Sequence, residues 1–278
     1  MTNPATELPG SCLPTGLGPP VVVFCKSHSG SRLLVDMLCR AGVFMGAHAS
    51  GSGDSWDLAP LIRYLVTRYY PDYAPVLAGE DALLPDMIKT AFARHLDGYD
   101  PQSHQPWGWK VCETTFAIPV IRALFPEARY VHLLRDGRDI AFSNHIGPVD
   151  AFWRKIYFGR ADIESWHGMT LDGPGYRRRP HLFNAQHWLS SASLGHRAAL
   201  KLGPNCLELR YEELIKDLRG SADRLLAFLE LSDMAIDLPP IHVTSMGRFR
   251  RQPKRKLREV LALIAPLQRE LGYPTGET

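Results

Sequence analysis

One short segment of the chain gathers residues that bind anions. It runs from Lys26 to Arg32, after an apolar stretch that starts at Val21 and before a leucine-rich stretch that starts at Leu33. Backbone N–H groups at the start of a helix lack intrahelical partners and carry partial positive charge, so a bound phosphate satisfies them. The sequence therefore predicts a phosphate-binding turn formed by Lys26, Ser27, His28, Ser29, Gly30, Ser31 and Arg32.

A second group of polar residues follows a strand predicted over residues 129–134. The sequence Arg-Asp-Gly-Arg-Asp occupies residues 135–139, and Ser143 lies one helical turn further on. Arg135 offers a planar fork of donors that matches a phosphate, and the Ser143 hydroxyl adds a neutral donor. The alternative is a solvated turn whose ion pairs exchange with water.

Two later segments contain further candidates. Tyr211 follows a short apolar stretch, where a single tyrosine is more often a core or rim residue. Residues 247–258 contain seven positive charges, the strongest local charge in the chain. Because such a run is usually a solvated face, only Arg248 and Arg250 are taken as candidates for anion binding.

Hydrophobic periodicity predicts the elements that position these residues. Thr114 or Thr115 is the expected cap of a helix that ends at Phe125. Strands alternating with helices indicate an α/β fold, with a parallel sheet flanked by helices on both faces. Strands are predicted from Val21 and over residues 107–111, 129–134 and 206–209, and helices over residues 33–41, 58–69, 84–96, 114–125, 136–143, 221–229 and 260–267.

The length of 278 residues and a hydrophobic content of 45% fit one large domain, expected over residues 21–278. Residues 1–20, rich in Pro, Gly, Thr and Ser, are expected to form a mobile tail. Residues 147–180 lack periodicity and accumulate aromatic side chains. They form either an acceptor-site lid inserted in the domain or a loop packed on the core.

The composition narrows the choice of partner and location. A net charge of only +3 argues against a dedicated nucleic-acid binder and favours a small anion held in a local basic site. The five cysteines show no metal-ligand spacing and are expected to be reduced core residues. No signal peptide or membrane span is found in the sequence, so a cytoplasmic enzyme is expected.

Four segments together resemble one enzyme family. The loop 26–32 resembles the 5′-phosphosulfate loop of sulfotransferases that use 3′-phosphoadenosine 5′-phosphosulfate (PAPS), and residues 129–143 resemble the 3′-phosphate motif of the same family. Residues 209–214 look like the segment whose tyrosine lies beside the adenine, and residues 247–251 like the late glycine-basic loop. The four occur in the family order, which implies a P-loop NTPase-like sulfotransferase fold of bacterial type.

The loop departs from the family pattern at two positions. His28 stands directly before Ser-Gly, where the family has Lys or Arg, and Arg32 replaces a hydroxyl residue. A histidine is only partly protonated near neutral pH, so it stabilises leaving-group charge less reliably. Lys26, Arg32 and Lys110 are the residues expected to supply the missing charge. The Walker A pattern of ATP-dependent kinases is absent.

The resemblance also implies catalytic roles. His28 and Lys26 are expected to bind the phosphosulfate together with the loop N–H groups, and Lys110 to reach the transferring sulfonate. Related enzymes carry a general base after the first helix, and the nearest equivalents are Asp54, which we favour, and Asp57. The other candidates are His48, Glu113 and His132, the last more typical of a core histidine.

The sequence thus predicts sulfonate transfer from PAPS to a hydroxyl or amine group of a small-molecule, lipid or glycan acceptor. PAPS is expected as the cosubstrate, without a metal ion. The alternative is a protein of the same fold that binds PAPS, or its product 3′-phosphoadenosine 5′-phosphate (PAP), with little or no transfer. The sequence leaves the acceptor and the oligomeric state open.

Overall fold

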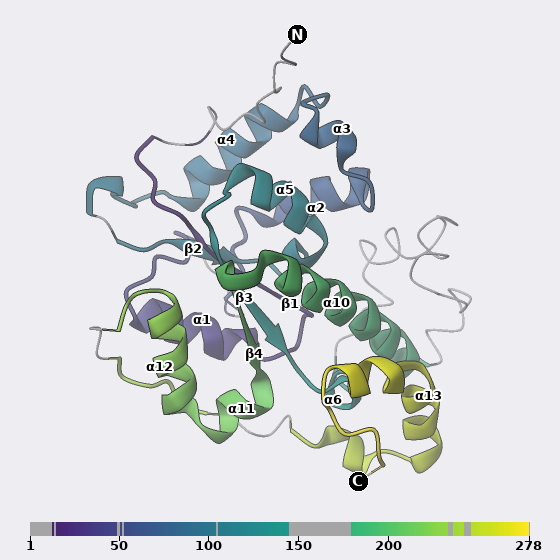
Figure 1. Cartoon of the computed structure of the whole chain (residues 1–278). Helices are drawn as coiled ribbons and strands as arrows, with labels where there is room; N and C mark the ends of the chain where they lie inside the picture. The colour runs from purple at the N-terminus through teal and green to yellow at the C-terminus, as the bar shows by residue number, and fades with distance from the viewer. Residues whose placement is uncertain are drawn as a thin grey trace.

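Four short parallel strands form the centre of the fold, which we describe from a computed structural model (Figure 1). Their order in the sheet is β2-β1-β3-β4. The strands are β1 (Val21–Cys25), β2 (Gly108–Lys110), β3 (Arg129–Leu134) and β4 (Cys206–Arg210). The structure describes residues 13, 15–48, 51, 53–103, 105–144, 179–232, 236–241 and 246–277.

The register places the carboxyl ends of the strands at one edge of the sheet. Cys25 is paired with Leu133, and Leu134 with Arg210, while Val23 is paired with Lys110. The segments that follow β1, β3 and β4 therefore leave the sheet side by side. These are the loop of residues 26–32, the turn that begins at Arg135, and the helix that begins at Tyr211.

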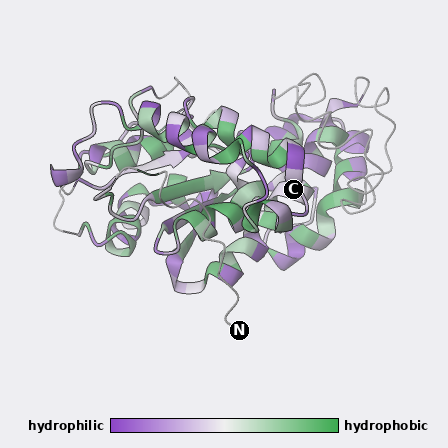
Figure 2. Cartoon of the chain, turned by 90° about the horizontal axis from the view of Figure 1, so that it is seen from above, coloured by the Kyte–Doolittle hydropathy of each residue, from purple (hydrophilic) through white to green (hydrophobic). Residues whose placement is uncertain are grey.

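Helices cover both faces of this sheet, as the sequence predicts. Side chains alternate between the faces of a strand, so Val22 and Phe24 pack on one side while Val21, Val23 and Cys25 pack on the other. Figure 2 shows a green strand at the centre, with hydrophilic residues on the outer surfaces of the helices. The α-helices are α1 (Ser31–Arg40), α2 (Ala59–Tyr69), α3 (Ala74–Leu77), α4 (Leu84–His95), α5 (Thr114–Leu124), α6 (Gly137–Ala141), α10 (Pro180–Leu202), α11 (Tyr211–Lys216), α12 (Leu218–Phe228) and α13 (Lys254–Glu270).

The helices of the structure differ from the sequence-based expectation in two places. The 23-residue helix α10 was not predicted, although it contacts α5, α6 and α13 as well as β3. The cap of α5 is Glu113, whose side chain makes no capping bond, and both threonines lie inside the helix. Thr114 is completely buried, so its side chain is directed into the core instead of toward the helix start.

Part of the predicted N-terminal tail packs on the domain. The Trp107 indole N–H donates to the carbonyl of Gly18 at 2.8 Å, and Leu17 lies against the core. Residues 1–12 of that tail, and residues 147–178 of the predicted lid, lie outside the described residues. Among the described helices, none has the length and apolar character needed to span a membrane.

Candidate active site

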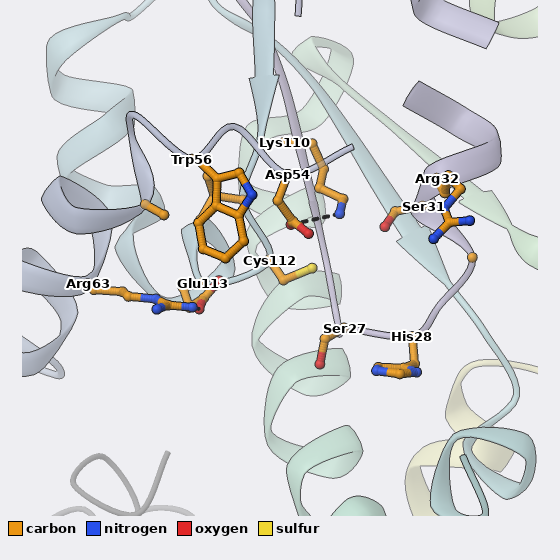
Figure 3. A pocket seen from close by; sticks show the side chains of 13 residues that line it. Ser27, His28, Ser31, Arg32, Asp54, Trp56, Arg63, Lys110, Cys112 and Glu113 are labelled. Carbon is orange, nitrogen blue, oxygen red and sulfur yellow. Dashed lines mark hydrogen bonds and ion pairs between the residues drawn. The ribbon is translucent and has the colours of Figure 1, made fainter. Parts of the chain in front are cut away.

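A cavity of about 340 Å³ opens at the carboxyl ends of β1 and β2. Figure 3 shows Lys110 facing Asp54, with the Trp56 ring beside them and the loop residues toward the other side. Polar and charged residues from three separate parts of the chain thus meet around one space. The cavity is lined by Ser27, His28, Gly30, Ser31, Arg32, Asp54, Trp56, Ala59, Arg63, Lys110, Val111, Cys112 and Glu113.

The loop after β1 presents the start of α1 to this cavity. Gly30 is the N-cap of α1 with φ +90°, and no side chain caps the helix. His28 also has a positive φ of 69°. The N–H groups of the first helical turn thus lack a side-chain acceptor, which is the arrangement that binds an anion. Ser31 lines the cavity, whereas Ser29 is buried and does not.

Lys26 lies beneath the loop and is not part of the cavity lining. The residue is 3% exposed, and its ammonium group donates to the carbonyl and the hydroxyl of Ser27, at 3.0 and 2.9 Å. Burial lowers its pKa to about 8. In this structure the Lys26 ammonium group therefore stabilises the loop through its bonds to Ser27.

A short ion pair in the cavity joins Lys110 to Asp54. The Lys110 Nζ to Asp54 Oδ1 distance is 2.7 Å, and the side chains are 3% and 29% exposed. Burial would lower the pKa of Lys110, but the neighbouring thiols and the Asp54 carboxylate outweigh burial and raise it. The structure brings together these two predicted residues, a cation and a more accessible carboxylate.

Asp57, the second candidate base, is directed away from this cavity. Its carboxylate, 4% exposed, bonds to His48 Nδ1 at 3.0 Å and pairs with Arg94 Nε at 3.3 Å. Asp57 lines another cavity, of about 380 Å³, between α2 and α4. His48 is bonded to Asp57 and lines neither of these two cavities. Glu113 lines the first cavity but is paired with Arg63, and His132 is a buried residue bonded to Glu208.

His28 is surrounded by positive charge. Loss of solvent and the nearby cations Lys26, Arg248, Arg135 and Lys110 lower its pKa to about 4. The imidazole is therefore neutral at pH 7. The position where the family has a cationic side chain is uncharged in the protein without bound ligand.

Arg135 connects the turn after β3 to both the loop and the start of α11. It is 5% exposed, donates to the carbonyl of His28 at 3.1 Å, and lies 4.3 Å over the ring of Tyr211. The same ring lies against Gly30, where an added Cβ would stand 2.2 Å from it. Only glycine leaves room there. Three of the four sequence segments are therefore in direct contact.

The fourth segment is tied to the turn through Asp139. The carboxylate of Asp139 accepts from the backbone N–H of Gly247 at 2.9 Å, and the Arg138 guanidinium lies 4.0 Å over the Phe249 ring. Arg248 is close enough to lower the pKa of His28. Arg250 is exposed and lies 5.6 Å from the Phe249 ring.

Ser143 carries an unused donor just beyond α6. Its hydroxyl oxygen is buried and has no hydrogen-bond partner among the described residues. A buried hydroxyl without a partner is unusual in a folded protein. The Ser143 side chain is therefore available for a ligand at this edge of the sheet.

A family model described as the sulfotransferase family matches residues 19–235. The chain belongs to the sulfotransferase family. No match was found among the curated proteins.

Three solved sulfotransferase structures share the fold of this family member. The enzyme of Alicyclobacillus acidocaldarius is 14% identical with a TM-score of 0.53, over 92% of this chain and 97% of that chain. The sulfotransferase STF9 of Mycobacterium avium is 13% identical with a TM-score of 0.53, over 95% and 79% of the two chains. The sulfotransferase domain of the curacin biosynthetic pathway is 13% identical with a TM-score of 0.51, over 93% and 99%. The predicted P-loop-like sulfotransferase fold is confirmed.

Sequence reasoning missed two residues that line the sulfotransferase cavity. Trp56 is 54% exposed, although it is one of the largest hydrophobic side chains of the chain. Arg63 Nη2 pairs with Glu113 Oε1 at 2.8 Å on the neighbouring wall. Trp56 carries a recognisable signal, since a tryptophan inside a Gly/Ser-rich loop has few core contacts to make. Arg63 carries none, because one arginine on a helix resembles any surface charge.

Proposed function

We propose that this chain transfers the sulfonate group of PAPS to a hydroxyl or amine group of a small-molecule, lipid or glycan acceptor. The observation that supports this best is the convergence of the four motif segments. Arg135 contacts the loop and Tyr211, and Asp139 holds the loop at Gly247. Four unrelated surface turns would not be expected to contact one another in this way.

The residues present fit a nucleotide with phosphates at both ends. The uncapped start of α1, with Arg32 beside it, offers donors and positive charge for the 5′ end. The unpartnered hydroxyl of Ser143 and the Arg135 guanidinium offer donors for a 3′-phosphate. Tyr211 is 5% exposed between its neighbours, so its main contribution is to position Gly30 and Arg135.

PAPS, when bound, supplies an already activated sulfonate. The chain must then align the acceptor and neutralise negative charge at the cavity. Lys110 carries three N–H donors, so it can keep its bond to Asp54 and still donate into the cavity. His28, as a neutral ring, contributes one N–H donor without charge. The charge has to come from Lys110, Arg32 and Arg248.

Asp54 is the residue we propose as the general base. It is the most accessible carboxylate of the cavity, since Glu113 is only 7% exposed and is paired with Arg63. Its carboxylate accepts the proton of the acceptor hydroxyl or amine. The Trp56 ring beside it provides an apolar face on which an acceptor can pack (Figure 3).

The second candidate is a nucleotide-binding protein of the same fold with slow or no transfer. It is favoured by one observation: the pKa of His28 is lowered to about 4, so the ring adds no charge at neutral pH. This candidate predicts PAP binding without sulfonate transfer to any member of a broad acceptor panel.

Thermal shift with PAP and with ATP tests the nucleotide assignment, and transfer of label from PAPS to an acceptor panel tests the reaction. We expect stabilisation by PAP but not by ATP. The Lys110→Ala variant should lower kcat by about 10²–10³-fold while PAP still binds. Lys89→Ala, which removes an exposed lysine on α4, is the matched control and should leave kcat unchanged. Stabilisation by ATP alone would overturn the proposal.

A further inference from the structure

Two buried thiols lie against each other at the wall of the cavity. The Cys25 Sγ to Cys112 Sγ distance is 3.6 Å, and the two residues are 1% and 8% exposed. Both thiols are reduced in this structure. Cys25 ends β1 immediately before the loop, and Cys112 lines the cavity two residues after Lys110. The pair is outside the roles assigned above.

The backbone places this pair where a disulfide can form. The last registered pair of β1 and β2 is Val23 with Lys110, and each cysteine lies two residues beyond it. Strand β2 ends at Lys110, so Cys112 lies in the turn that follows the strand. Both cysteines belong to the buried cluster that contains Leu34 and Leu38 of α1, and their sulfur atoms are 3.6 Å apart, so a small shift of this turn brings them within bonding distance.

The surroundings make Cys25 the more reactive thiol of the pair. The hydrogen bond from the Cys112 thiol, helped by the charge of Lys110, lowers the pKa of Cys25, while the pKa of Cys112 is raised. Ser31 also bonds to the Cys25 sulfur. Cys112 lines the cavity and the Cys25 sulfur lies 3.6 Å from the Cys112 sulfur, so a small oxidant approaches the pair from the cavity.

We propose that Cys25 and Cys112 form a redox modification site, at which a peroxide links the two thiols and disables the loop of residues 26–32. In the first step the Cys25 thiolate takes one oxygen from hydrogen peroxide, the O–O bond breaks, and the released hydroxide takes a proton and leaves as water. In the second, the Cys112 sulfur attacks the Cys25 sulfur, an S–S bond forms, and the hydroxyl of Cys25 leaves as water with the Cys112 proton. The thiols are oxidised and the peroxide is reduced.

The new bond changes the geometry of the loop. The sulfur atoms must approach from 3.6 Å to about 2.05 Å. Cys25 is directly followed by Lys26, which holds the loop, and Ser31 loses the thiol to which it bonds. PAP affinity is therefore expected to fall by about tenfold or more on oxidation, an effect that rests on the proposed function.

A variant that retains only this pair gives the cleanest test: Cys12→Ser, Cys39→Ser and Cys206→Ser combined. On treatment with hydrogen peroxide we expect the intact mass to fall by two hydrogen atoms and a digest to contain the Cys25 and Cys112 peptides joined. Dithiothreitol should reverse both. The control adds Cys112→Ser, which leaves Cys25 without a partner and should give sulfinic acid instead.

Two further readouts separate this inference from the reaction. Hydrogen exchange of residues 26–32 should change on oxidation whether or not the protein binds a nucleotide, and PAP binding should weaken and recover with dithiothreitol. Over-oxidation of Cys25 without a joined peptide would overturn the proposal. A joined peptide with unchanged hydrogen exchange and unchanged PAP binding would overturn the effect on the loop. Failure of the reduced protein to bind PAP would count against the proposed function alone.

Discussion

The two ends of the site are built in different ways. At the turn after β3, the charged side chains are buried and bonded to one another: Asp136, Arg138 and Asp139 are each at most 6% exposed. At the cavity, Lys110 and Glu113 are also buried, but Asp54 is 29% exposed and Arg32 is exposed. The charged side chains hold the backbone at the first end, and part of the charge is left accessible at the second.

This difference suggests separate roles: the buried turn positions Arg135, and the cavity holds the residues proposed to carry out the transfer. Asp136 accepts from the Arg138 guanidinium at 2.8 Å and from Gln268 at 2.9 Å, so the turn is held on several sides. The Trp188 indole N–H also donates to the carbonyl of Arg135 at 2.9 Å. A rigid turn can orient Arg135 without taking part in transfer. Substitutions at the turn should therefore affect stability, and substitutions at the cavity should affect turnover.

The largest effect is expected at Asp54. Asp54→Asn removes the proposed base and should lower kcat by about 10²–10⁴-fold, with little change in the free energy of unfolding. The matched variant Asp57→Asn alters a carboxylate of the other cavity and should leave kcat within a few-fold of the starting value. Equal kcat losses in the two variants would mean that Asp54 is not the base.

The next effect is expected at the buried turn. Asp136→Asn leaves the Arg138 guanidinium without its carboxylate and should lower the free energy of unfolding by about 3–5 kcal/mol in urea titrations. Asp36→Asn, which breaks a surface pair with Arg40, should cost less than about 1 kcal/mol. A stable Asp136→Asn protein with strongly reduced kcat would contradict the division between the two ends.

A smaller effect is expected at Ser143. Removing one hydrogen bond to a charged phosphate costs about 1.5 kcal/mol or more, so Ser143→Ala should weaken PAP binding by about tenfold in calorimetric titrations. The next residue, Asn144, is exposed, and Asn144→Ala provides the control variant, which should leave PAP binding unchanged. Because the Ser143 hydroxyl has no described partner to lose, the melting temperature of Ser143→Ala without ligand should stay unchanged. A lower melting temperature would indicate a structural role.

The smallest effect is expected at His28. Its folded pKa of about 4 lies below the ordinary value of 6.5, so the ring is uncharged from about pH 6 to about pH 8 and should add no inflection to kcat/KM there. Adding the missing charge with His28→Lys should raise kcat severalfold. His28→Gln keeps a neutral donor and should change kcat little. A large loss in His28→Gln would assign the ring a catalytic role.

The sequence was sufficient for the sheet and for the order of the motifs because both are short-range patterns. Apolar runs mark β1 and β3, and each of the first three motifs directly follows a strand end. Helix α10 escaped because it carries polar residues such as Asn184 and Gln186 that are buried rather than exposed. A helix is recognised in a sequence by the contrast between an apolar face and a polar face. This contrast is weak in α10.

The residues of the candidate site were largely predictable, but the directions in which their side chains point were not. Asp54 and Asp57 lie in one loop, and only its path decides which cavity each one meets. Gly53, with φ +73°, packs against Val35 of α1 and sets that path just before Asp54. Lys26 was expected at the phosphosulfate, yet the tight turn directs its side chain under the loop. Cys39 was expected in the core and is exposed.

The contact between Gly30 and Tyr211 has a consequence for biosynthesis. The loop is translated before the ring that braces it and before the segment at Gly247, which Asp139 holds. On the ribosome, the loop therefore emerges before its supports exist. A nascent chain can complete the proposed nucleotide site only after Gly247 has left the exit tunnel, so ligand binding can assist folding only from that point on.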